Sequence, residues 1–283
     1  MNTSRLPVLV GVSDKEPTAI RCALSEARRR GTGLRVVHCY ELPAQAAEFY
    51  IGTDILTSMR TAGEAVLDEA REVVEASADS AGVEVDYVLA HGTPDNVLSG
   101  LSLEADSLVL GADDIPWYDR MLGGAVAGYL ARKAACPVIV VPERVVPPRV
   151  GGGVVVTIDG DTSASGPLRY GFEQCDARNE TLTVLHAAPV ATLQQDFDNH
   201  RANVAEIVAG WQELYPDVQV VRSTTSGDPI ETCIASTARA SLVVIGRPHG
   251  FTIPFVTARP VAMQVLREAQ CPVAIVGANY RGI

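Results

Sequence analysis

Short runs of aliphatic residues alternate with helical patterns along the chain. In the first half, the aliphatic runs predict strands near 7–12, 34–39, 84–89, 107–111 and 137–141. Between them, apolar residues recur at helical spacing and predict helices over 18–30, 63–80, 94–102 and 124–135. Strands that alternate with helices are the order expected of a parallel sheet covered by helices on both faces, so the pattern predicts an α/β fold.

The second half repeats this plan. Its aliphatic runs predict strands near 153–158, 181–186, 218–223, 241–246 and 272–276. A long helix is predicted over about 198–214, and its apolar positions are expected in the core: Val204, Ile207, Val208, Trp211 and Leu214. The chain therefore has two five-stranded α/β patterns in tandem.

Local sequence also recurs between the halves at one constant separation. The matching positions are Gly92 and Gly227, Gly111 and Gly246, and the Cys-Pro-Val segments at Cys136 and Cys271. Because all three pairs of positions have the same separation, they indicate an internal duplication. We therefore predict two copies of one domain, residues 1–142 and 153–283, joined by a linker at 143–152 that is rich in proline and glycine.

Composition narrows the class of protein. Hydrophobic residues make up 47% of the chain and charged residues 20%, which is typical of a globular protein. The net charge of -11 disfavours nucleic acid and acidic membranes as partners. No apolar run approaches a membrane span, and the six cysteines show no Cys-x-x-Cys pair, so we expect reduced, mostly buried thiols and a cytoplasmic location.

Some repeated residues invite a catalytic interpretation. His38 and His186 end equivalent strands, and Cys136 and Cys271 each precede a proline. The simpler interpretation is that the histidines are hydrogen-bonded structural residues and the cysteines are small buried groups. The chain shows no recognised nucleophile, metal or phosphate-loop motif. We therefore predict that the protein is not an enzyme and has neither catalytic residues nor a metal site.

The aliphatic strands that end at Gly111 and Gly246, each followed later by Cys-Pro-Val and a last strand, resemble the universal stress protein family. The stretches 104–111 and 134–141 and their second-copy equivalents carry most of the likeness, which covers nearly the whole chain. The resemblance implies an adenine nucleotide α-hydrolase-like sandwich. It also implies pairing through last strands, so 137–141 and 272–276 are expected to join the copies as a pseudo-dimer. A further homodimer and protein partners stay open.

Many members of this family bind ATP with an Asp after the first strand and a Gly-x2-Gly-x9-Gly-(Ser/Thr) loop. Glycine lets the backbone approach a phosphate closely. The first copy keeps Gly111 and Gly124, but Asp114 replaces the second glycine and Ala125 replaces the hydroxyl residue. Ser13 stands where the acidic residue is expected. The first copy thus keeps glycines and lacks the acid.

The second copy differs from the motif in the opposite way. It keeps the acidic residue as Asp159 and the first glycine as Gly246. His249 holds the second glycine position, and Arg259 followed by proline replaces the last glycine. Because proline has no N–H to donate, the backbone site is lost. Arg247, His249 and Arg259 could instead form an anion site from side chains.

Two hypotheses stay open at this point. In the first, the chain is a non-catalytic binding or signalling module of the stress response in which the ATP motifs are degraded. In the second, it is a sensor of ATP or another nucleotide with one modified pocket. A receiver domain is disfavoured, because Ala90-His91-Gly92 and Pro142-Glu143-Arg144 lack its acceptor Asp and its Lys.

Overall fold

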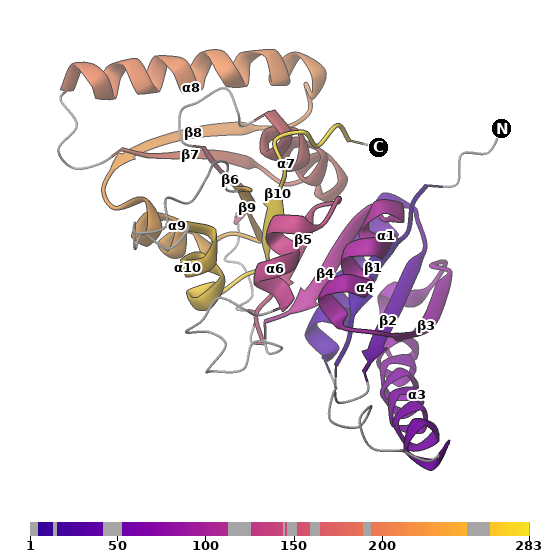
Figure 1. The fold of residues 1–283 in the computed structure, drawn as a ribbon. Coiled ribbons are helices and arrows are strands. Elements are labelled where there is room, and N and C mark those ends of the chain that lie inside the picture. The colour runs from indigo at the N-terminus through magenta and orange to yellow at the C-terminus, as the bar shows by residue number, and fades with distance from the viewer. Residues whose placement is uncertain are drawn as a thin grey trace, which may run out of the picture. The chain divides into compact units, whose positions relative to one another are not determined.

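The computed structural model describes residues 5–13, 16–41, 53–112, 126–143, 145, 152–158, 165–188, 194–247 and 261–282. The chain divides into two compact units, Met1–Glu143 and Arg144–Ile283 (Figure 1). Each unit is described by itself. The limits of the linker and the pairing of the two last strands stay predictions.

The first unit has a parallel sheet with the strand order β3-β2-β1-β4-β5. Its strands are β1 (Val8–Gly11), β2 (Leu34–Tyr40), β3 (Val85–His91), β4 (Ser107–Gly111) and β5 (Val138–Val141). Its helices are α1 (Pro17–Arg30), α3 (Thr53–Glu75), α4 (Pro94–Leu101) and α6 (Val126–Lys133), with short 3₁₀ turns η1 (Ala78–Ser80) and η2 (Ser102–Glu104). The predicted α/β fold is confirmed.

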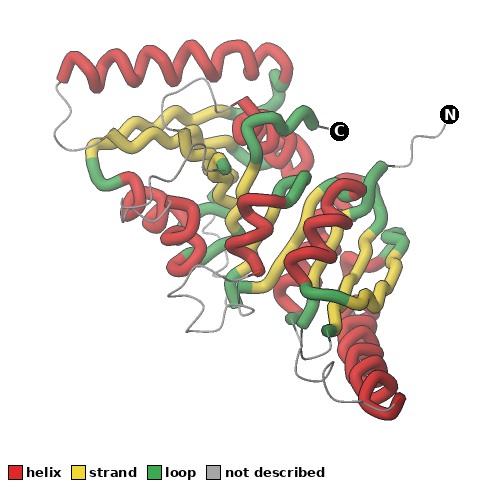
Figure 2. The backbone as a smooth tube through the Cα atoms, viewed as in Figure 1, coloured by secondary structure: helices red, strands yellow, loops and turns green. Residues whose placement is uncertain are grey.

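The strand order places a topological switch between β1 and β4. From β1 the chain runs outward through β2 and β3, and it then returns to β4 on the other side of β1. Helix α1 packs against α3, and α4 packs against α6, so the helices form two pairs beside the strands (Figure 2). Right-handed crossovers put these pairs on opposite faces of the sheet. At such a switch point a crevice opens outside the carboxyl ends of the strands.

The ends of α1 follow from its sequence. Pro17 occupies its first turn, where a missing N–H costs nothing, and the predicted apolar stripe including Ile20 and Leu24 is buried. Gly31 ends the helix with φ 61°, a left-handed conformation that glycine adopts without steric cost. In the second unit Asn179 ends the equivalent helix with φ 54°. Asparagine is one of the few other residues that tolerate this region.

The second unit repeats the topology, with the strand order β8-β7-β6-β9-β10. Its strands are β6 (Val154–Ile158), β7 (Leu182–Ala188), β8 (Val220–Ser226), β9 (Leu242–Gly246) and β10 (Val273–Val276). Its helices are α7 (Ser165–Arg178), α8 (Gln194–Leu214), α9 (Pro229–Thr237) and α10 (Val261–Glu268).

The duplication extends to individual hydrogen bonds. The backbone N–H of Ala135 donates to Ser102 Oγ at 2.8 Å, and the N–H of Gln270 donates to Thr237 Oγ1 at 3.1 Å. In each unit, a hydroxyl at the end of the helix that leads into the fourth strand, α4 or α9, thus fixes the turn that precedes the last strand. The two units therefore share the packing around this turn as well as the strand order.

Two sequence predictions were wrong in detail. The helix predicted over 63–80 spans Thr53–Glu75. Residues 56–62 are mostly exposed, so the pattern of buried positions begins only at Gly63, and Ser77 caps η1 beyond the end of the helix. Leu214 was expected in the core but is 65% exposed. The helical stripe through Val204 and Val208 continues to Tyr215, which stacks on Phe172 with ring centroids 5.3 Å apart.

The cysteines fit the expectation from composition. All six cysteines are free, and four of them, including Cys136 and Cys271, are buried. Burial raises the pKa of Cys271 to about 12, so this thiol stays protonated. Within the described ranges, the helices are too short or too polar to cross a membrane.

Candidate functional site

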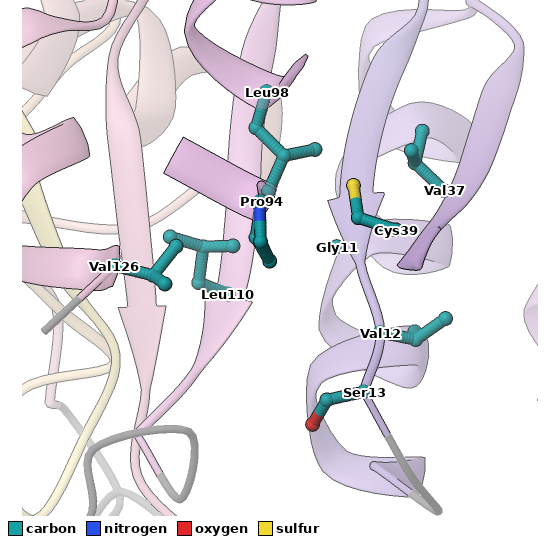
Figure 3. A pocket seen from close by; sticks show the side chains of 9 residues that line it. All are labelled: Gly11, Val12, Ser13, Val37, Cys39, Pro94, Leu98, Leu110 and Val126. Carbon is teal, nitrogen blue, oxygen red and sulfur yellow. The ribbon is translucent and has the colours of Figure 1, made fainter. Parts of the chain in front are cut away.

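A cavity of about 220 Å³ lies in the first unit at the switch point between β1 and β4. It is lined by the carboxyl ends of the inner strands and by the starts of α4 and α6 (Figure 3). The lining residues are Gly11, Val12, Ser13, Val37, Cys39, Pro94, Leu98, Leu110 and Val126. Aliphatic side chains dominate this wall, so the cavity favours an apolar or flat ring over a strongly hydrated group.

Gly11 lets the side chains of the opposite wall close over β1. A Cβ atom added at Gly11 would lie 2.9 Å from Leu98 Cδ1 and 2.9 Å from Leu110 Cδ2. Both leucines are buried. At Gly11 the floor of the cavity is therefore formed by backbone atoms. A larger residue there would displace the side chains of Leu98 and Leu110.

Cys39 contributes its thiol to the cavity wall. The residue is half-buried and lies at the carboxyl end of β2. Burial raises the pKa of this thiol to about 11, from 9.0. At neutral pH the thiol is protonated and is a poor nucleophile. It contributes polarisable surface to the cavity rather than a reactive group.

Ser13 is the polar residue of the wall, and it is tied to a carboxylate behind it. Ser13 Oγ donates a hydrogen bond to Glu16 Oε1 at 2.9 Å. Glu16 is only 7% exposed at the start of α1, whereas Ser13 is exposed at the end of β1. A Cβ atom added at Gly111 would lie 2.6 Å from Glu16 Oε2. Glu16 thus packs directly on Gly111 and joins the end of β4 to the end of β1.

The backbone amides at these strand ends already have partners. Val12 N–H donates to Val37 O at 2.9 Å, and Ala112 N–H donates to Val141 O at 2.8 Å. In the second unit Arg247 N–H makes the equivalent bond to Val276 O at 2.7 Å. A phosphate at this edge could recruit these donors only at the expense of the sheet.

The two repeated histidines hold strands together. His38 Nδ1 lies 2.8 Å from Val12 O, and His186 Nδ1 lies 3.0 Å from Ile158 O. In each unit the second strand is thereby tied to the end of the first. The interpretation of both histidines as hydrogen-bonded structural residues is confirmed.

In the second unit, two predicted positions are described. Gly246 ends β9, and Arg247 follows it. The Arg247 guanidinium lies against Gly277, because a Cβ atom added there would be 3.8 Å from Arg247 Cζ. Gly124, Asp159, His249 and Arg259 lie outside the described residues, so their roles stay predictions.

The side chains at the switch point differ between the units. Thr157 takes the place of Gly11, and the smaller Cys233 takes the place of Leu98. Burial raises the pKa of Cys233 to about 11, and a side-chain hydrogen bond with Thr157 opposes this. The bulk that Leu98 supplies in the first unit is thus shared by two smaller residues in the second.

Sequence reasoning located part of this site and missed part. It named Ser13 and Gly111 separately, and the structure brings them together through Glu16. Glu16 went unnoticed, although a carboxylate directly before a proline at a helix start is a recognisable signal. The described residues contain no cluster of His, Cys, Asp or Glu that could hold a metal ion.

The duplicated fold defines a tandem α/β protein in which each unit has a five-stranded parallel sheet with a topological switch between two inner strands. The sequence pattern of the universal stress protein family matches residues 5–142 and again 153–277. The chain belongs to this family.

Comparison with individual proteins agrees with this assignment. The chain is 29% identical to universal stress protein Rv2623 of Mycobacterium tuberculosis over 86% of each chain. A crystal structure of a universal stress protein from Archaeoglobus fulgidus matches with a TM-score of 0.73 and 19% identity over 95% of each chain. A universal stress protein crystallised in complex with cAMP matches 49% of this chain and 98% of its own, with 21% identity and a TM-score of 0.39.

Proposed function

We propose that the protein is a non-catalytic ligand-binding module of the stress response, and that the cavity of its first unit binds a small ring such as the adenine part of a nucleoside. The observation that carries this proposal is the mostly aliphatic cavity at the switch point. In open α/β sheets this is the place where ligands bind.

The size of the cavity favours a ring over a complete nucleoside triphosphate. Pockets for drug-sized ligands usually measure about 300 to 1,000 Å³, and this one measures about 220 Å³. The Ala112 amide is committed to Val141, and the Glu16 carboxylate packs on Gly111. Both features disfavour a phosphate at the described start of the loop. They therefore support the prediction from the sequence that the ATP-binding motif is degraded.

The chemistry of the wall supports a binding role. The Cys39 thiol is held protonated by its raised pKa, and His38 is held by Val12 O. Neither is poised as a nucleophile or base toward the cavity. The six free cysteines suit a reducing compartment such as the cytoplasm.

Calorimetry with adenosine and with Mg-ATP tests the proposal on protein purified without nucleotide. The variant Cys39→Phe fills the cavity, and Ala187→Phe is its control because Ala187 occupies the same strand position in the second unit. We expect adenosine to bind, Cys39→Phe to weaken binding at least about tenfold, and Ala187→Phe to leave it unchanged. Absence of adenosine binding, or equal effects of both variants, would contradict the proposal. Micromolar binding of Mg-ATP would favour the alternative, a sensor of intact nucleotide.

A further inference from the structure

We propose that the outer edge of β8 in the second unit binds an extended acidic peptide, which joins the sheet as a further strand in a groove between β8 and α8. The groove measures about 910 Å³, and its walls are formed by residues of these two elements. Figure 1 shows α8 running alongside β8 within this unit. Binding at this groove needs no ligand in the cavity of the first unit.

In the first unit, helix α3 packs closely on the equivalent edge strand, β3. Arg71 Cζ of α3 lies 4.5 Å from the centre of the Tyr87 ring. A Cβ atom added at Gly63 of α3 would lie 2.7 Å from Leu89 Cδ1. Tyr87 and Leu89 therefore face α3, and their bulk occupies the space between the helix and the strand.

The second unit replaces both of these residues with polar ones. In the strand register, Arg222 is the counterpart of Tyr87. Thr224 is likewise the counterpart of Leu89, since each lies opposite the repeated histidine of its unit. Both polar residues line the groove, and Arg222 is exposed. A short hydroxyl side chain and a solvated guanidinium do not pack on a helix as a leucine and a tyrosine ring do, so space for a ligand is left beside α8.

The backbone of β8 offers hydrogen bonds to such a ligand. β8 is the last strand of the sheet in this unit, and no strand within the described residues pairs with its outer edge. Leu182 N–H of β7 donates to Gln219 O at 2.8 Å, so Gln219 turns its backbone groups toward β7. Alternate residues turn the other way, so Val220, Arg222 and Thr224 direct their N–H and C=O groups outward. These three residues all line the groove, and an edge of this kind accepts an extended peptide as an added strand.

The charges of the groove select an acidic peptide. Arg201 on α8 and Arg222 on β8 give each wall an exposed guanidinium, although the chain as a whole has a net charge of -11. Asp198 also lines the groove, so arginines outnumber carboxylates there. A guanidinium binds a carboxylate through two parallel hydrogen bonds, and alternate side chains of an added strand point to the same face, so alternate carboxylates would lie toward α8. A small free anion would leave the edge of β8 unpaired, which favours a peptide.

Fluorescence anisotropy with labelled peptides as long as β8, seven residues, tests this binding on the full chain. In the first peptide glutamate alternates with valine, and in the second lysine replaces each glutamate. The third is the glutamate peptide N-methylated at every backbone amide. We expect the glutamate peptide to bind and the other two to bind at least about tenfold more weakly. The lysine peptide lacks the charge match, and the N-methylated peptide cannot donate hydrogen bonds to the carbonyl groups of β8.

Charge reversal in the groove gives a matched pair of variants and a control. Arg222→Glu and Arg201→Glu should each weaken binding of the glutamate peptide at least about tenfold and strengthen binding of the lysine peptide. Arg239→Glu makes the same change of charge at an exposed position of the second unit outside the groove lining, and it should leave both affinities within about twofold. Because all three arginines are exposed, the variants should keep the circular dichroism spectrum of the unmodified protein.

Amide hydrogen exchange shows whether the peptide pairs with the edge. With the glutamate peptide bound, the amides of Val220, Arg222 and Thr224 should gain protection, whereas those of Val221 and Ser223 face β7 and should change little. Absence of binding, equal binding of the glutamate and lysine peptides, binding that neither variant weakens, or no added protection at the three amides would overturn the inference. Protection that rises with protein concentration without peptide would also overturn it, by assigning the edge to a second copy of the chain. The proposed function is tested separately by the adenosine calorimetry.

Discussion

The packing at Gly11 yields a prediction whose sign and size follow from the structure. In the variant Gly11→Ala, the new methyl group would lie 2.9 Å from Leu98 Cδ1 and from Leu110 Cδ2. Carbon atoms in contact prefer about 3.5 to 4.0 Å, so each leucine must move by about 0.6 Å or more. Overpacking of a closed core costs about 1 to 3 kcal/mol, and the added alanine recovers up to about 1 kcal/mol by restricting the unfolded chain. We expect a net loss of about 1 kcal/mol.

Gly100→Ala provides a matched control with the opposite sign. Gly100 lies inside α4, and a Cβ atom added there meets nothing within 4 Å. In a helix interior, alanine is about 0.5 to 1 kcal/mol more favourable than glycine. The same substitution should thus destabilise the first unit at Gly11 and stabilise it at Gly100.

A double-mutant cycle with Leu98→Ala identifies the source of the loss. In the second unit, Thr157 is accommodated opposite the smaller Cys233, so truncation of Leu98 should make room for a side chain at Gly11. We expect the loss caused by Gly11→Ala to be smaller in the Leu98→Ala background, because the contact with Leu98 is removed while the contact with Leu110 Cδ2 at 2.9 Å remains, with a coupling of about 0.5 to 3 kcal/mol.

The assay is urea denaturation followed by circular dichroism. Hydrogen exchange of the amides of β1 and β4 reports on the first unit by itself, because two units need not unfold together. The reasoning is refuted if Gly11→Ala stabilises the protein as much as Gly100→Ala does, or if Leu98→Ala leaves its effect unchanged.

Two further predictions concern a thiol and a buried ion cluster. At pH 8, a pKa of about 11 leaves roughly one Cys39 thiol in a thousand ionised, against about one in ten at the ordinary pKa of 9.0. Alkylation of Cys39, mapped by mass spectrometry, should therefore be about 100-fold slower in the folded protein than for an ordinary thiol. Its rate should rise as the pH approaches 11 and should fall further when adenosine is bound. Arg30 Nε lies 2.6 Å from Glu26 Oε1 and 3.2 Å from Asp106 Oδ2, all buried. Arg30→Met should cost about 3 to 5 kcal/mol because it removes this cation from two buried carboxylates, and the pairing of Glu26 with the partly exposed Arg29 at 3.1 Å does not replace the contact with Asp106. Arg178→Met, in the second unit, removes a donor at 2.8 Å from an uncharged amide and should cost only about 1 kcal/mol; equal losses in denaturation would contradict this account.

The sequence by itself determined the architecture of each unit. Strand and helix positions follow from periodicity, since a buried parallel strand such as β4 must be aliphatic throughout and a covering helix such as α1 must carry an apolar stripe. The sequence also revealed the duplication and the family. It predicted the structural roles of His38 and His186 as well, because these equivalent residues recur at equivalent strand ends. Periodicity failed where burial was weak, at the start of α3.

Only the tertiary structure decided what the site contains. Sequence motifs direct attention to the loop that begins at Gly111, yet the cavity is formed by side chains from strands and helices far apart in the chain. The relation of Ser13, Glu16 and Gly111 depends on the return of β4 to the side of β1, which no local pattern specifies. A hydrogen bond and a close packing contact are fixed by distances of a few ångströms. Such distances between remote residues exist only once the sheet has assembled.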